Sequence, residues 1–227
     1  MSMKKSLGQQ GFGKEYWEVN YAEPDEMDNI INAREHAAYM KAIFALEAID
    51  ISSVIDLGFG LGVLFQEVLN SFIPYRACGI EPSKHIFDIT SKKLIKPADS
   101  TKLLLENIDL VTWAQKEYKS GSKKDKVYDL AICTSVLQYL SDEEIEMVLP
   151  VLAQRARYLY LSVPTDLELK KQIEEVDFHD QYAIHRSRGK YLKFIHPNFT
   201  FISSRLLESK IHFNEDTSSF TDLLFRF

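Results

Sequence analysis

The sequence is poor in cysteine, in positive charge and in long hydrophobic runs, and each shortage excludes a class of protein. Only Cys78 and Cys133 occur among 227 residues, with no CxxC and no Cys/His ligand spacing, which argues against a disulfide scaffold and against a metal site. Acidic residues outnumber basic ones, and the formal net charge is −6, so no global field attracts nucleic acid or an anionic membrane. We therefore expect neither nucleic acid nor a membrane as a partner, and a small molecule instead.

The chain also lacks an obvious secretion signal or membrane-spanning run. Residues 1–13 have a basic start but no apolar stretch, and the most apolar window, Val54 to Phe65, is interrupted by Asp56 and three glycines. We expect a cytoplasmic protein, either monomeric or homodimeric. Its 45% hydrophobic and 26% charged residues are typical of a globular chain that buries one core.

Apolar runs alternate with segments of helical periodicity along the chain. Ser141 and Glu144 form a capping-box pattern that starts a helix, which Pro150 should bend or end early. Strands alternating with helices predict a parallel sheet in an α/β fold. The expected strands are 53–57, 77–80, 103–105, 130–133 and 158–163, and the expected helices are 25–49, 61–72, 82–94, a helix from 110, a helix from 141, and 166–178.

Three alternating glycines join the strand at Ser53 to Leu57 to the next helix. In DLGFGLG, residues 56–62, glycine permits unusual φ values and lets a ligand lie against the main chain, while the helix start offers N–H donors to an anionic group. A tight turn with close helix packing would explain a lone motif of this kind equally well. The pattern becomes more specific with Glu81, which lies 19 residues after Gly62 at the end of the second strand. An acidic side chain there accepts hydrogen bonds from ribose hydroxyls, which indicates an adenosine-type ligand.

Two other nucleotide motifs fit less well. A phosphate-binding turn of the Walker type needs Gly-Lys-Ser/Thr, which the sequence lacks, so ATP hydrolysis is disfavoured. A dinucleotide turn reads G-x-G-x-x-G/A, and Val63 occupies its sixth position. An NAD(P)-dependent oxidoreductase is therefore the alternative enzyme.

These residues resemble the motifs of class I S-adenosylmethionine-dependent methyltransferases. DLGFGLG is similar to the family's first motif, IEPS at 80–83 to its second, and YDLAICTSVLQYL at 128–140 to its strand-four motif, in the family's order. SSRLLESKIHF at 203–213 and TDLLFRF at 221–227 more loosely resemble the last helix and the closing strand pair. The resemblance implies a three-layer Rossmann-like α/β sandwich, with a mostly parallel seven-stranded sheet and an antiparallel closing strand.

The resemblance also implies S-adenosylmethionine as cofactor and assigns its contacts. Asp56 would hold the ligand ammonium, Glu81 the ribose, and Thr134 would flank the sulfonium. The acidic position after strand three aligns with Asp109, which would face the adenine, or with Asn107. The full set of expected cofactor contacts is Tyr16, Tyr21, Asp56, Gly58, Phe59, Gly60, Gly62, Glu81, Pro82, Ile108, Asp109 and Thr134.

Methyl transfer from a sulfonium needs alignment, desolvation and, for a hydroxyl or ammonium acceptor, proton removal. The long connection after strand five collects basic and histidine side chains and is the natural place for acceptor specificity. We predict that residues 177–196 form the acceptor-side wall, with His185 and Arg186 as catalytic or acceptor contacts. Arg186 suits an acidic or phosphorylated acceptor and His185 suits proton transfer, whereas a solvated surface is the alternative interpretation.

The resulting expectation is one methyltransferase domain over residues 1–227. It comprises a helical cap at 1–50, a cofactor-binding core at 51–165, an acceptor-side insertion or lid at 166–200, and the last helix with the closing strands at 201–227. The expected function is methyl transfer to a small molecule by in-line displacement. A methyltransferase-like binding protein without turnover is the non-enzymatic alternative.

Overall fold

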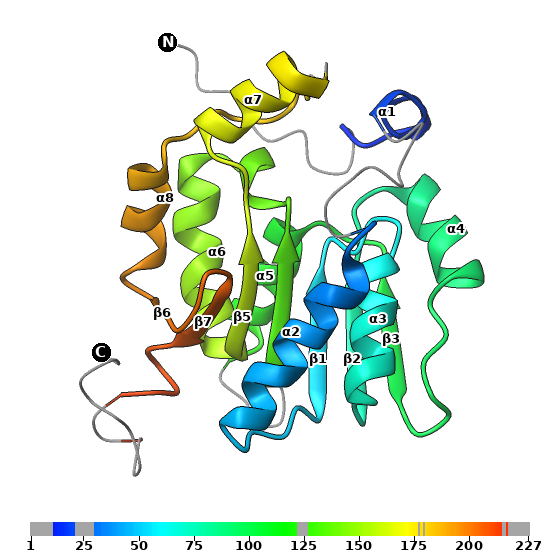
Figure 1. Ribbon diagram of the computed structural model, residues 1–227, viewed down its shortest axis with the longest axis vertical. Helices are drawn as coiled ribbons and strands as arrows, with labels where there is room; N and C mark the ends of the chain where they lie inside the picture. Colours follow the sequence, from blue (N-terminus) through cyan, green and yellow to red (C-terminus); the bar gives the residue numbers. More distant parts are fainter. Residues whose placement is uncertain are drawn as a thin grey trace. The chain divides into compact units, whose positions relative to one another are not determined.

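The computed structural model describes residues 11–20, 30–121, 127–176, 178, 180–214 and 217. The described residues form two compact units, an N-terminal unit within residues 8–110 and a C-terminal unit from residue 111 onward. Figure 1 labels the helices and strands of both. Strands and helices alternate from residue 53 to residue 176, as the sequence pattern predicts.

The N-terminal unit contains three parallel strands in the order β3-β2-β1. In register, Asp56 of β1 lies opposite Gly79 of β2, and Leu57 lies opposite Ile80, so the ends of the two strands coincide. Its elements are α1 (Lys14–Asn20), α2 (Ala33–Leu46), β1 (Ser53–Leu57), α3 (Val63–Phe72), β2 (Arg76–Ile80), α4 (Lys84–Lys93) and β3 (Lys102–Glu106).

Helices α2 and α3 pack together on one side of these strands, as Figure 1 shows. Apolar side chains recur every three or four residues on each helix, and this periodicity gives each one a buried face. Phe44 and Phe72 meet edge to face, with ring centroids 6.0 Å apart. The helix expected over residues 25–49 begins only at Ala33, because residues 30–32 form a turn, and residues 21–29 lie outside the described ranges.

The C-terminal unit contains four strands in the order β4-β5-β7-β6, of which β4 and β5 are parallel and the others antiparallel. Figure 1 shows α7 beyond the carboxyl end of β5, which it follows directly in the chain. The elements are α5 (Leu110–Lys119), β4 (Tyr128–Thr134), the 3-10 helix η4 (Leu137–Tyr139), α6 (Asp142–Arg155), β5 (Ala156–Ser162), α7 (Asp166–Val176), α8 (Arg188–Ile195), β6 (Phe199–Phe201) and β7 (Leu206–Ser209).

Two expectations for this unit need correction. Helix α6 starts with the predicted capping box of Ser141 and Glu144, but it continues through Pro150 and ends at Arg155. The helix expected in residues 203–213 is instead β7, which pairs with β5 through Leu206 and Tyr160. All four residues of β7 are buried, and a short apolar run of this kind fits a buried strand as well as a helix. Residues 221–227, expected as closing strand, lie outside the described residues.

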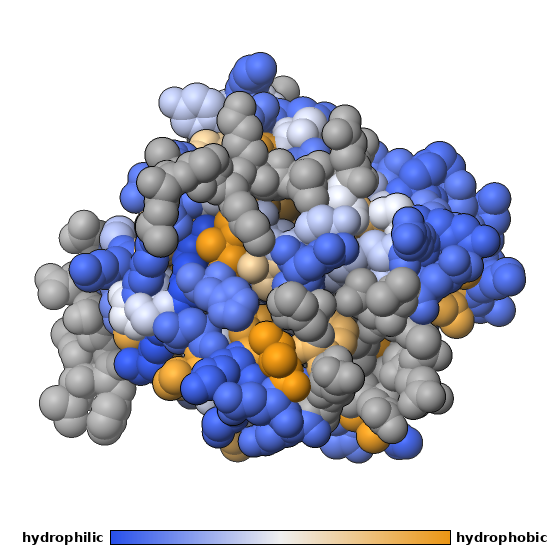
Figure 2. Space-filling view, turned by 90° about the horizontal axis from the view of Figure 1, so that it is seen from above, coloured by the Kyte–Doolittle hydropathy of each residue, from blue (hydrophilic) through white to orange (hydrophobic). Residues whose placement is uncertain are grey.

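The expected fold class is confirmed: the described residues form an α/β structure with seven mostly parallel strands and an antiparallel closing strand. Both cysteines, Cys78 and Cys133, are buried, and they are not joined in a disulfide. Within the described ranges, no helix has the length and apolar character needed to cross a membrane. The face seen in Figure 2 is mostly hydrophilic with small hydrophobic patches, as on ordinary protein surfaces.

Arg155, at the end of α6, provides a test of the C-terminal unit. Its guanidinium is 4% exposed, lies 2.9 Å from Glu117 Oε2, and donates hydrogen bonds to the oxygens of Glu117, Ser120 and Gly121 at the end of α5. Arg155→Met should lower the free energy of unfolding by about 3 kcal/mol, because it leaves these acceptors without their buried donor. Arg157→Met is the matched control: Arg157 is 57% exposed, and its Nε lies 4.0 Å from Asp129. It should change stability by less than about 0.5 kcal/mol in urea denaturation.

Candidate functional site

The glycine turn between β1 and α3 has a backbone that only glycine adopts easily. Gly58, Gly60 and Gly62 have φ values of +96°, +52° and +73°. A Cβ on Gly62 would lie 2.6 Å from Cγ2 of Thr90, and a Cβ on Gly60 would lie 3.3 Å from Cη2 of Trp17. The two positions therefore require glycine both for their conformation and for the close approach of neighbouring side chains.

Hydrogen bonds fasten this turn to the end of β2. The N–H groups of Gly58 and Phe59 both donate to the carbonyl oxygen of Ile80, at 2.8 and 3.1 Å. The N–H of Gly60 donates to Glu81 Oε2 at 2.9 Å, and the N–H of Ser83 donates to Glu81 Oε1 at 2.8 Å. A carboxylate offers about four acceptor positions, so Glu81 keeps capacity for ligand hydroxyls after binding these two amides. The predicted pairing of the turn with Glu81 is thus a direct contact.

Asp56 and Glu81 are two buried carboxyl groups, 4% and 3% exposed. Burial, and secondly the nearby Glu81, raise the pKa of Asp56 to about 8, against a backbone hydrogen bond from Leu57 that lowers it. Burial also raises the pKa of Glu81 to about 7, although the amides of Ser83 and Gly60 oppose the shift. The two groups share one acidic region, whose ionised form calls for a positive partner.

Asn107 supports the loop that carries Glu81, a role that the sequence pattern does not identify. Its side-chain amide donates to the carbonyl oxygens of Glu81 and Pro82, at 2.8 and 3.1 Å. This position was one of two that align with the family's acidic residue after strand three. Since Asn107 holds the loop, the adenine contact stays a prediction for Ile108 and Asp109, which are half-buried next to the start of α5.

Aromatic residues lie on both sides of the turn. Phe59 is an expected cofactor contact, but its side chain is buried against Phe65 and Phe87, with centroid distances of 6.4 and 6.0 Å. The expected contact Tyr16 is buried in α1, as is Trp17, which sequence reasoning missed. The approach of Trp17 to Gly60 spans 43 residues of chain (60 − 17), so no local pattern could have indicated it. Tyr21 lies outside the described residues.

Thr90 is a second residue that the sequence did not single out. It is fully buried in α4, and its Oγ1 donates to the carbonyl oxygen of Gly60 at 3.1 Å. Gly60 is therefore held at its N–H by Glu81 and at its carbonyl by Thr90. These bonds fix the turn before any ligand arrives, which is the preorganisation that binding sites need.

In the C-terminal unit, the end of β4 has an unusual conformation. Thr134, an expected cofactor contact, is half-buried at the last position of β4, and Ser135 follows with φ +55°. Non-glycine residues rarely adopt this conformation, and they do so most often at functional positions. Gln138 is 3% exposed, and its Oε1 has no hydrogen-bond partner among the described residues. A buried amide oxygen of this kind is costly unless something binds it.

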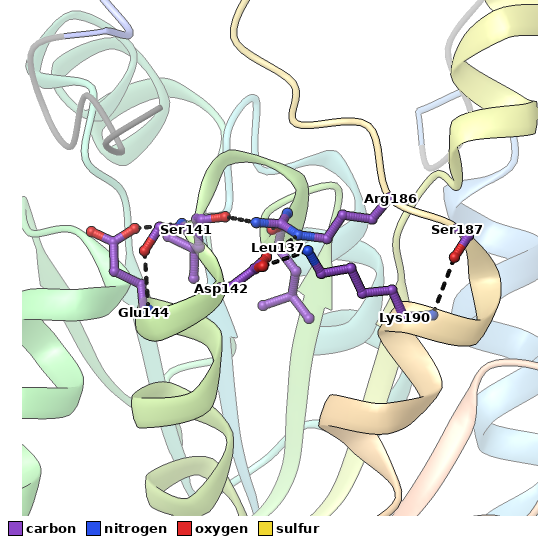
Figure 3. Close-up of polar contacts among 8 residues, drawn as sticks. Leu137, Ser141, Asp142, Glu144, Arg186, Ser187 and Lys190 are labelled. Atoms are coloured by element: carbon purple, nitrogen blue, oxygen red, sulfur yellow. Dashed lines mark hydrogen bonds and ion pairs between the residues drawn. The ribbon is translucent and has the colours of Figure 1, made fainter. Parts of the chain in front are cut away.

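Arg186 lies at the centre of a polar cluster that includes Asp142, drawn in Figure 3. The guanidinium, 2% exposed, lies 2.8 Å from Asp142 Oδ1 and donates to the carbonyl oxygens of Leu137 and Leu140. Lys190 forms an ion pair with the other oxygen of Asp142. Burial alone would raise the pKa of Asp142, but the hydrogen bonds from Lys190 and Arg186 outweigh it and lower that pKa.

These contacts favour a positioning role for Arg186 over the expected contact with an acceptor. The segment before it is also tied to η4: the N–H of Ile184 donates to the carbonyl oxygen of Gln138 at 2.8 Å, and Tyr139 donates to Asp180 Oδ2 at 2.5 Å. His185 is exposed, and its acceptor contact stays a prediction. Among the residues whose positions are described, no three His, Cys, Asp or Glu side chains gather closely enough to hold a metal ion.

Solved methyltransferase structures share this fold. The plantazolicin methyltransferase BpumL in complex with SAH has a TM-score of 0.59 at 15% identity, covering 80% of this chain and 68% of its own. The plantazolicin methyltransferase BamL, in complex with a triazolic desmethylPZN analog and SAH, has a TM-score of 0.58 at 17% identity, covering 81% and 67%. An S-adenosylmethionine-dependent methyltransferase from Clostridium acetobutylicum ATCC 824 has a TM-score of 0.60 at 10% identity, covering 84% and 98%.

These likenesses show a common Rossmann-like fold. No protein-family model and no curated protein matches the sequence.

The ion pair of Arg186 generates a stability prediction. Arg186→Met should destabilise the protein by about 3 kcal/mol, because Asp142 and two carbonyl oxygens lose a donor that is buried. Lys190→Met serves as control, since Lys190 contacts the same carboxylate but is 46% exposed, and it should cost less than about 1 kcal/mol. Equal effects in chemical denaturation would contradict the positioning role.

The buried carboxyl groups predict a pH dependence. The folded pKa of Asp56, about 8, lies above its ordinary value of 3.8, so the fold favours the protonated acid. This contribution to stability is present below about pH 4 and is lost as the pH rises through about 8. Asp56→Asn removes the titration, so the variant should gain stability relative to the unchanged protein between about pH 5 and pH 8. Denaturation curves of both proteins at the two pH values test this, and a constant difference would exclude the raised pKa.

Proposed function

We propose that this chain is an S-adenosylmethionine-dependent methyltransferase that acts on a small molecule. The observation that carries the proposal is the contact of Glu81 with the Gly60 amide, in a turn that joins β1 to α3 within a Rossmann-like fold. An adenosine-type site uses both the glycine turn and the acidic residue after β2, and one hydrogen bond joins the two here. The shared fold with solved methyltransferases supports this choice of ligand.

The residues of the N-terminal unit fit the proposed cofactor. The remaining acceptor positions of Glu81 suit the two hydroxyls of a ribose, and ionised Asp56 suits an ammonium. The glycine positions leave backbone uncovered by side chains of their own, and among the described residues α3 has no side-chain cap on its first turn. Ligand binding would thus supply the positive charge that the buried carboxylates need, and affinity should rise with pH as they ionise.

When bound, S-adenosylmethionine supplies an electrophilic methyl group on a sulfonium sulfur. The chain has to orient the acceptor, exclude water and accept a proton if the acceptor carries one. Thr134 is retained as a proposed cofactor contact at the end of β4. No covalent nucleophile is required for this chemistry.

We assign the acceptor side to the C-terminal unit, within residues 166–200. Gln138 in η4, against which this stretch packs, has a buried amide oxygen without a hydrogen-bond partner among the described residues, and Arg186 holds the 180–186 segment against η4 and α6. In this arrangement Arg186 acts through the segment it positions, and exposed His185 is the candidate proton acceptor. The acceptor is then a small molecule with a polar group that can hydrogen-bond to an amide.

Ligand binding tests the proposed cofactor against its alternatives. S-adenosylhomocysteine should raise the melting temperature in a concentration-dependent way while NAD does not, because only a ligand of the native state stabilises it. The reverse ranking would favour the oxidoreductase. Binding of S-adenosylmethionine without methyl transfer to any acceptor in a panel of small molecules would favour the non-catalytic alternative.

A variant of Glu81 tests the proposed ribose contact. Glu81→Gln keeps the shape of the side chain but removes its charge, so the affinity for S-adenosylhomocysteine should fall by about 1–3 kcal/mol in calorimetric titrations. Glu67→Gln in α3, a half-buried position, is the matched control and should bind normally. Unchanged affinity of Glu81→Gln would place the ribose elsewhere.

A further inference from the structure

Helix α1 has two different faces. Lys14 and Glu18 form an exposed ion pair of 3.1 Å on the outer face, whereas Tyr16 and Trp17 are only 6% and 9% exposed. The two aromatic rings meet edge to face with centroids 5.9 Å apart, and Phe12 packs on Tyr16 at 5.1 Å. A helix this short is not stable by itself, so the packing of its aromatic side chains against the rest of the unit holds it in place.

Trp17 covers the glycine turn at Gly60. Cη2 of its indole lies 3.3 Å from where a Cβ on Gly60 would be, so a residue larger than glycine at position 60 would press against the ring. Gly60 is also the residue whose N–H donates to Glu81. The indole therefore borders Gly60, the residue whose backbone N–H is bonded to the Glu81 carboxylate.

The surroundings of this contact are acidic and aromatic. Burial and the charge of Glu81 raise the pKa of Asp56, burial raises the pKa of Glu81, and backbone amides lower both. Buried carboxylates need a positive partner to ionise, and the face of an indole attracts cations more strongly than any other aromatic side chain. The ammonium proposed for Asp56 is common to the methylated and demethylated forms of the cofactor, so the charge that the indole could distinguish is the sulfonium.

We infer that Trp17 is a specificity-determining residue, whose indole favours the positively charged sulfonium ligand over the neutral thioether that remains after transfer. This inference rests on the proposed function. S-adenosylmethionine carries a sulfonium, and S-adenosylhomocysteine differs from it by the loss of a methyl group and of that charge. A residue that senses the charge helps the protein to bind the cofactor in the presence of its product.

Calorimetric dissociation constants for both ligands test the inference. In Trp17→Leu, the preference for S-adenosylmethionine over S-adenosylhomocysteine should fall by about 3- to 10-fold, because leucine keeps the apolar bulk but has no π-face. Trp17→Phe should recover part of the preference, since phenylalanine is a weaker cation binder than tryptophan. Thermal melting of each variant verifies that α1 and the fold are retained.

Two further measurements separate contact with the ligand from packing. Phe12→Leu removes a neighbouring ring that packs on Tyr16, and it should leave the ratio of the two affinities unchanged. The chain has two tryptophans, so in Trp113→Phe the emission comes from Trp17 alone, and it should change more on titration with S-adenosylmethionine than with S-adenosylhomocysteine.

The outcomes are distinct. If Trp17→Leu lowers the affinity for both ligands equally, Trp17 contacts the ligand without selecting for charge. If the variant binds both ligands more tightly, Trp17 obstructs the site. Either result overturns the inference. An unchanged affinity ratio would also overturn it. If the unchanged protein binds neither S-adenosylmethionine nor S-adenosylhomocysteine, the proposed function itself fails. Binding of NAD in a parallel titration would then favour the oxidoreductase.

Discussion

The hydrogen bond from the Gly60 amide to Glu81 joins two segments of chain that the sequence separates by 21 residues. Parallel pairing of β1 and β2 brings their ends together, with Leu57 opposite Ile80, and Glu81 then reaches the turn that follows β1. Asn107 holds the Glu81 loop from the end of β3, and Thr90 holds the carbonyl side of Gly60. The three bonds place an acidic group, a bare backbone and a helix start in one rigid region. That region is what an adenosine-type ligand requires.

Rigidity here is obtained at a cost in stability. Two carboxyl groups are buried close together, and their raised pKa values record how strongly the fold disfavours their charged forms. A protein selected only for stability would replace Asp56 with a neutral residue at this position. The presence of Asp56 is better explained by a ligand that carries a positive charge, because the bound ligand would stabilise the ionised carboxylate that burial disfavours.

Local patterns predicted most of the fold, and pairings between distant residues account for what they missed. The limits of β1, the capping box at Ser141 and the glycine turn follow from short-range rules of periodicity, capping and backbone conformation. The helix expected at 203–213 was wrong because Leu206 and Leu207 fit a buried strand equally well until β5 is known to lie beside them. Trp17, Thr90 and Asn107 could not be chosen from the sequence, since their importance comes only from contacts with Gly60 and the Glu81 loop.

Arg186 shows why residue type alone is a weak guide to function. An arginine in a long connection after a parallel strand suits an anionic acceptor, and the sequence contains no sign of its partner 44 residues earlier. In the structure Asp142 and two backbone carbonyls occupy the guanidinium, and its burial means that any anionic ligand would have to displace them. Separating a buried guanidinium from these three acceptors costs more than a surface contact with an anionic ligand returns. The neighbouring amide of Gln138 has the opposite character, buried but without a partner for its oxygen in the described structure, and is therefore the stronger candidate for contact with an acceptor.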